Sequence, residues 1–160
     1  MWDIVRDELS LDLDAGMAVR VAVRLLAAAA LGAVVGLERE VRGRAAGLRT
    51  HMLVSLGAAL FTLVPISAND GSHLAEIVKG VAAGVGFLGA GAILKQPDEQ
   101  KIKGLTTAAG IWLTAAVGLA AGAGAVLPAA GATVMSLVIL AVFGRWEQML
   151  TDDGAKQGKG

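Results

Sequence analysis

The chain has 160 residues, which suits one domain, with fourteen basic and fourteen acidic side chains and no cysteine. Hydrophobic residues make up 55% of it and charged residues only 18%, against roughly 25% in soluble domains. The lack of cysteine excludes disulfides and thiolate metal sites, and two histidines are too few for a histidine-rich metal site. We therefore expect a membrane protein that is not an enzyme and that holds no cofactor or metal.

Five long apolar stretches predict transmembrane helices, because several approach the ~20 residues that span a bilayer. In chain order these stretches cover residues 17–37, 51–66, 74–94, 105–121 and 125–143. The predicted fold class is all-α, a polytopic bundle of about five helices that spans residues 17–144. We expect an acidic interfacial segment over residues 1–16 and a disordered tail over 145–160.

The basic residues fall unevenly on the two sides of this bundle. Ten of the fourteen lie in the connection between the first and second helices, in the connection between the third and fourth, or in the C-terminal tail. Cytoplasmic loops carry the excess of Lys and Arg, so the N-terminus should lie outside and the C-terminus in the cytoplasm.

Residues 84–89 spell G-x-G-x-x-G, which marks a dinucleotide site only between a strand and a helix. Here the motif lies inside an apolar helix, so we interpret its glycines as a surface for close helix packing. The residues predicted to pack helices are Gly80, Gly84, Gly86, Gly89, Gly91, Gly104, Thr106 and Thr107. Gly32 with Gly36, and Gly118 with Gly122, repeat the same small-xxx-small spacing.

Charges near the apolar stretches are the candidates for function, because ions at membrane depth need partners. Glu38 and Arg49 flank the first basic connection, where they either pair with each other, bind a partner's charge, or only fix topology. Arg24 lies deeper, and it either snorkels to the surface or pairs with Asp70 or Glu76. Short polar side chains at helix ends, such as Thr50, predict caps or back-bonds rather than ligands.

At these segments the chain resembles the MgtC/SapB family of bacterial inner-membrane proteins. Five stretches in order carry the resemblance: Arg24-Leu-Leu, Gly36-Leu-Glu-Arg-Glu40, Ala46-Gly-Leu-Arg-Thr-His51, Gly86-Phe-Leu-Gly-Ala-Gly91 and Lys103-Gly-Leu-Thr-Thr-Ala-Ala-Gly-Ile-Trp-Leu-Thr114. The resemblance implies a five-helix membrane domain and links the chain to growth at low magnesium and to virulence. The polar positions that it carries over are Arg24, Glu38, Arg39, Glu40, Arg49 and Thr50.

The resemblance also implies a regulatory role rather than a defined reaction. Action on the F-type ATP synthase has been proposed for the best-known branch, whose members continue into a soluble domain after the last helix; this chain resembles the short, membrane-only branch. We expect it to bind the lipid bilayer and another integral membrane protein, such as that synthase or a transporter, or a second copy, and no nucleic acid. The alternative is a transporter of magnesium or a small solute, with Arg24, Glu38 and Asp70 along its path.

Overall fold

The computed structural model describes residues 2, 15–67, 73–95 and 102–144. The predicted segments 1–16 and 145–160 lie outside these ranges, apart from residues 2, 15 and 16. Within them the chain forms five helices, which confirms the predicted all-α class. They are α2 (Ala15–Val41), α3 (Leu48–Ser67), α4 (Leu74–Ala92), α5 (Leu105–Gly122) and α6 (Val126–Val138), which continues as the π-helical turn η2 (Ile139–Phe143).

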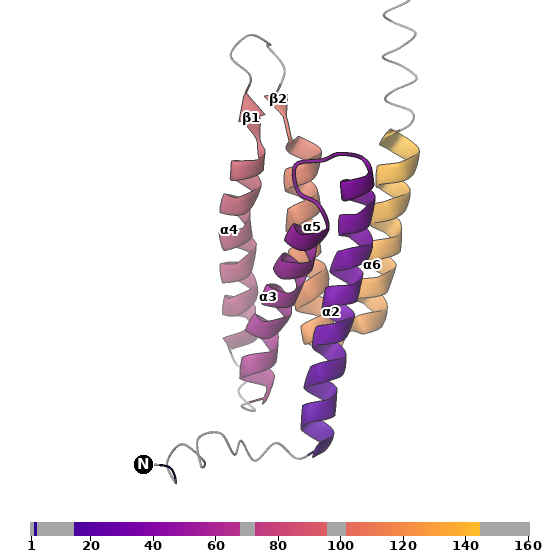
Figure 1. Ribbon diagram of the computed structural model, residues 1–160. Helices are drawn as coiled ribbons and strands as arrows, with labels where there is room; N and C mark the ends of the chain where they lie inside the picture. The colour runs from indigo at the N-terminus through magenta and orange to yellow at the C-terminus, as the bar shows by residue number, and fades with distance from the viewer. Residues whose placement is uncertain (1, 3–14, 68–72, 96–101, 145–160) are drawn as a thin grey trace, which may run out of the picture.

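The helices run up and down in sequence, and consecutive helices lie side by side (Figure 1). Their predicted positions hold, but α2 runs four residues beyond its predicted end and α3 begins three residues before its predicted start. Apolar stretches mark what lies in lipid, whereas Glu and Arg are good helix formers that extend a helix into polar surroundings. As a result Glu38 and Arg39 belong to α2, and Arg49 belongs to the first turn of α3.

Two short strands lie between α4 and α5. Strand β1 (Leu94–Lys95) pairs antiparallel with β2 (Ile102–Lys103). Gly104 follows β2 with a φ of 98°, and a Cβ there would collide with the carbonyl oxygen of Ala92. Gly104, which we predicted to pack helices, therefore forms a tight turn, where only glycine fits comfortably.

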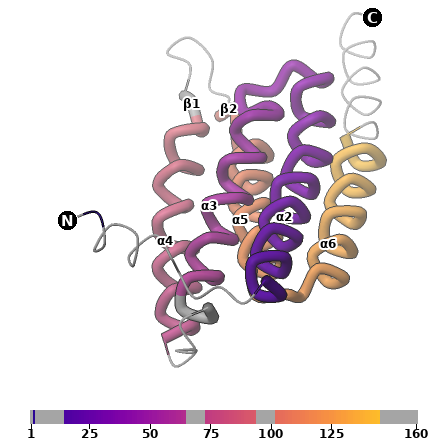
Figure 2. Tube along the Cα trace, turned by 60° about the horizontal axis from the view of Figure 1, so that its bottom comes forward, coloured from indigo at the N-terminus to yellow at the C-terminus, as the bar shows by residue number. Residues whose placement is uncertain are grey.

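Four of the helices are long and apolar enough to cross a membrane: α2, α4, α5, and α6 together with η2. α3 has 20 residues and is also apolar over Leu48–Val64, the stretch whose side chains the structure describes. α3 packs against both α2 and α5 in the middle of the bundle, while α4 packs mainly on α5 and only lightly on α3 (Figure 2). The chain is therefore a multi-pass membrane protein whose most enclosed helices are α3 and α5.

Glycines of α2 and of α5 let both helices pack closely against α3. A Cβ on Gly32 of α2 would lie 2.7 Å from the carbonyl oxygen of His51, and one on Gly36 would lie 2.7 Å from the Cα of Leu48. From α5, Gly118 lies against the backbone of Ser55. Side chains at these positions would force the helices apart, so the small-xxx-small spacing does build the bundle.

The glycines of α4 do not pack as we predicted. A Cβ on Gly80, Gly84, Gly86 or Gly91 would meet no atom within 4 Å. Gly89 alone of the predicted α4 glycines has a neighbour, Ala108 of α5, at an ordinary 3.5 Å. The prediction of close packing inside this chain is wrong for the first four, because α4 has one main neighbour and turns its other faces outward.

Candidate functional site

The arginine-rich end of the bundle, which we define as residues 38–50, contains a charged cluster on the last turns of α2. Arg39 is 2% exposed, and its Nε donates a hydrogen bond of 2.5 Å to Glu38 Oε2. Glu38 Oε1 lies 2.5 Å from Arg42 Nε, in an ion pair whose geometry falls outside that of a hydrogen bond. One carboxylate therefore neutralises the buried Arg39 while it holds the partly exposed Arg42.

The predicted pair between Glu38 and Arg49 is wrong. Glu38 pairs with Arg39 of its own helix and with Arg42 just beyond the end of that helix. Arg49 is exposed on the first turn of α3 and makes no ion pair within the described part of the chain. Arg49 and the exposed Thr50 instead border a polar depression of about 540 Å³, together with Glu40, Gly47 and Leu48.

Glu40 caps α3 across the connection between the helices. Its Oε2 accepts a hydrogen bond of 2.8 Å from the backbone N–H of Leu48, the first residue of α3. A carboxylate at this position also complements the positive end of the helix dipole. The three charges of the Glu38-Arg39-Glu40 sequence thus have separate structural tasks, which spacing alone does not reveal.

His51 is a buried functional candidate that the sequence reasoning missed. The side chain is fully buried, and its Nδ1 lies 2.9 Å from the carbonyl oxygen of Gly47. His51 Nε2 and Arg39 Nη1 are buried without a hydrogen-bond partner among the residues that the structure describes. The signal for His51 was present: it shares one face of α3 with Ser55 and Thr62, at i, i+4 and i+11.

Arg24 lies at the opposite end of the bundle. Its Nη1 donates a hydrogen bond of 3.1 Å to the carbonyl oxygen of Gly122, the last residue of α5. Its partner there is a backbone carbonyl, and Glu76 lies exposed beside His73 instead. Asp70, the other predicted acid, lies outside the described residues. Arg24 therefore links α2 to the end of α5, at the end of the bundle opposite the arginine-rich one.

The buried Ser and Thr side chains with hydrogen-bond partners stabilise the helices. Thr107 is buried on α5 while Thr106 is exposed, so only Thr107 faces the bundle as predicted. Five buried hydroxyls in the core donate hydrogen bonds to backbone carbonyl oxygens: Ser55, Thr62, Thr114, Thr133 and Ser136. Such back-bonding satisfies a hydroxyl inside a membrane bundle.

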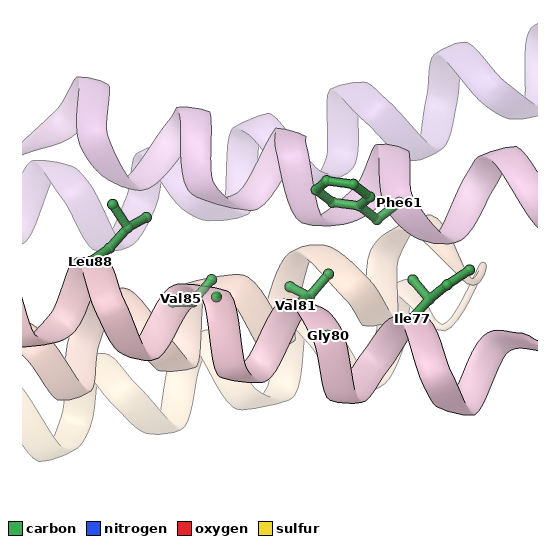
Figure 3. A pocket seen from close by; sticks show the side chains of 7 residues that line it. Phe61, Ile77, Gly80, Val81, Val85 and Leu88 are labelled. Carbon is green, nitrogen blue, oxygen red and sulfur yellow. The ribbon is translucent and has the colours of Figure 1, made fainter.

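An apolar groove of about 490 Å³ runs between α3 and α4. Figure 3 shows Phe61 of α3 on one side and Ile77, Val81 and Leu88 of α4 on the other. Gly80 and Gly84 form part of the α4 side. The groove is therefore bordered by the same glycines that make no close contact inside the chain.

Comparison with known proteins agrees with this architecture. A sequence profile described as the MgtC family matches residues 25–149. The chain belongs to the MgtC family. No solved structure matches the chain.

Three similar proteins differ in how much of their length this chain matches. Protein SrpB of Synechococcus elongatus is 46% identical over 138 residues, 79% of this chain and 76% of its own length. The Escherichia coli protein named "Putative magnesium transporter YhiD" is 43% identical over 129 residues, 76% of this chain and 59% of its own. Protein MgtC of Brucella abortus is 39% identical over 128 residues, 80% of this chain and 53% of its own. The chain thus matches little more than half the length of YhiD and MgtC.

Proposed function

We propose that this protein regulates growth at low magnesium in the bacterial inner membrane by binding another integral membrane protein through the outer face of α4. The observation that carries this proposal is the glycine content of that face. Each glycine inside a helix is about 1 kcal/mol less favourable than alanine. Gly80, Gly84 and Gly91 share one side of α4 at the spacing i, i+4 and i+11, and they bear this cost without any close contact inside the chain.

A second transmembrane helix would recover the cost, because small residues let two helix backbones approach and gain packing contacts. Lipid chains need no glycine to pack. The neighbouring groove beside Phe61 offers a place for a large side chain of the same partner (Figure 3). The family resemblance favours the F-type ATP synthase or a transporter as that partner, and a second copy of this chain is the alternative.

Copurification from native membranes tests the proposal, with growth at low magnesium as the second readout. Gly84→Leu should abolish both the partner's recovery and growth, because the added side chain occupies the contact surface. Gly131→Leu on α6 is the matched control, since Gly131 is also exposed with nothing within 4 Å of an added Cβ. Equal recovery and growth with both variants would refute a contact at α4.

Transport of magnesium is the second candidate, and it is favoured by the relative YhiD, which is named as a putative magnesium transporter. Purified protein in liposomes, assayed for magnesium flux, separates the two functions. Magnesium flux through the wild-type protein would support transport and count against the regulator. A tight bundle without flux, which still captures a partner, would support the regulator.

A further inference from the structure

The polar depression at the arginine-rich end is lined by one charge of each sign. Glu40 and Arg49 are both exposed, and neither takes part in an ion pair within the described part of the chain. Glu40 accepts the N–H of Leu48 with Oε2, while its Oε1 and the Arg49 guanidinium have no hydrogen-bond partner among the described residues. The depression can therefore hold a molecule that carries both an anion and a cation.

The apolar groove between α3 and α4 extends toward this depression. A second section of the groove, of about 300 Å³, is lined by Leu53 and Val54 of α3 and by Leu88 of α4. Residues four apart lie on the same side of a helix, one turn from each other. Leu53 and Val54 therefore follow directly, along α3, on Arg49 and Thr50 of the depression. A polar hollow and an apolar groove are thus consecutive on one side of the bundle.

The surface of α3 beside the groove is apolar and faces outward. Leu53, Leu60 and Val64 are exposed, and they share the side of Arg49 at i+4, i+11 and i+15. In a multi-pass membrane protein such a stripe faces lipid, so Arg49 lies where the headgroup of a lipid meets its acyl chains. The ligand that this surface fits is therefore amphipathic, with a charged head and an apolar chain.

The two charges decide which headgroup fits. A guanidinium matches the geometry of a phosphate and binds it through two parallel hydrogen bonds. A carboxylate oxygen accepts hydrogen bonds from a primary ammonium, which carries three N–H donors, whereas a quaternary ammonium carries none. A headgroup with a phosphate but no cation would leave Glu40 beside a negative charge. Phosphoethanolamine supplies both the phosphate and the primary ammonium.

We infer that the depression binds the phosphoethanolamine headgroup of a membrane phospholipid. Arg49 holds the phosphate, Glu40 Oε1 accepts from the ammonium, and one acyl chain lies in the groove beside Leu53. The site is independent of partner binding at the outer face of α4, because it uses the section of the groove next to the arginine-rich end.

Native mass spectrometry of the full chain tests the headgroup without any variant. Lipids with identical acyl chains are added one at a time to the protein in detergent. Phosphatidylethanolamine should bind at least about tenfold more tightly than phosphatidylcholine, since only its ammonium can donate hydrogen bonds to a charged acceptor. It should also bind more tightly than phosphatidylglycerol, which has no ammonium. Equal binding of the first two lipids, or a preference for phosphatidylglycerol, would overturn the inference.

A competition experiment separates the lipid from its soluble headgroup. Glycerophosphoethanolamine has the same charges but no acyl chains, so it should not displace phosphatidylethanolamine at an equal concentration. Complete displacement would show that the groove contributes nothing and would overturn the proposed lipid.

Three variants then assign the two charges. Glu40→Gln keeps an oxygen that can accept from Leu48 but loses the carboxylate, so the preference for phosphatidylethanolamine over phosphatidylcholine should vanish. Arg49→Gln should weaken the binding of both lipids by a similar factor. Arg44→Gln is the matched control, because Arg44 is exposed in the same connection and does not line the depression. A preference that survives in Glu40→Gln, or equal losses in Arg44→Gln and Arg49→Gln, would overturn the inference.

Discussion

Arg24 Nη1 donates a hydrogen bond to the carbonyl oxygen of Gly122, 98 residues further along the chain. The same guanidinium lies against Gly124, whose φ is 90° in the turn between α5 and α6. A Cβ on Gly124 would lie 2.7 Å from Arg24 Nη2. α2 thus holds the end of α5 and the turn after it, and a positive charge at a helix C-terminus is favourable.

Removing this clamp should destabilise the bundle. Arg24→Met keeps an unbranched stem but loses the donor, so we expect a loss of about 1.5 to 3 kcal/mol, the contribution typical of hydrogen bonds to charged groups. Arg24→Lys should retain part of it, because an ammonium group still favours the end of the helix. Thermal unfolding in detergent measures both, and a Met variant as stable as the wild type would rule out a clamp.

The Glu38 carboxylate should matter far more than the exposed Arg49 guanidinium. Glu38→Gln leaves the buried Arg39 without its counter-charge, and breaking a buried pair costs about 3 to 5 kcal/mol. We expect the low end of this range, because the Arg42 side of the cluster is 25% exposed. Arg49→Gln should change stability by no more than about 1 kcal/mol.

Chemical denaturation and the yield of folded protein compare these two variants. Exchanging the charges, Glu38→Arg with Arg49→Glu, should rescue nothing, because the two side chains do not meet. Recovery of folded protein in the exchanged variant would show that they pair in the membrane after all.

Glycines of α5 and α4 should respond to alanine in opposite directions. Gly118→Ala puts a Cβ into the backbone of Ser55, 2.8 Å from its Cα, so the two helices must separate. The melting temperature should therefore fall by several degrees. Gly86→Ala meets nothing and should gain up to about 1 kcal/mol from helix propensity. Melting temperatures in the same detergent provide the test, and a stabilised Gly118→Ala would refute the close approach.

The orientation of the bundle can be tested with reporters. A reporter fused after Gly160 should be cytoplasmic, and one inserted at Asn69 should lie outside, because ten of the fourteen basic residues fall on the predicted cytoplasmic side. Reversed activities at the two positions would contradict this orientation.

The sequence was sufficient to predict the helices, because the length of an apolar stretch reports directly on a membrane span. The small-xxx-small spacing correctly predicted the helix contacts of Gly32 and Gly118. The same spacing at Gly80 and Gly84 wrongly predicted close contacts inside the chain. α4 is built of small and apolar residues on every side, so its pattern does not distinguish the face toward α5 from the face toward lipid.

The charged cluster shows a different limit. Glu38, Arg39 and Arg49 could be singled out because ions near lipid need partners, yet which charges meet depends on where α2 ends. Since α2 continues to Val41, Arg39 lies on the same helix as Glu38 and Arg42 follows directly after its end, whereas Arg49 is carried away onto α3. His51 was missed because its burial comes from three helices that meet, and no local pattern encodes such a meeting.

The 20 residues of α3 match the thickness of the bilayer. At 1.5 Å per residue, Leu48 to Ser67 spans about 30 Å, close to the hydrocarbon thickness of about 30 Å. The exposed Arg49 in the first turn would therefore lie at the headgroup level, where its guanidinium can meet lipid phosphates.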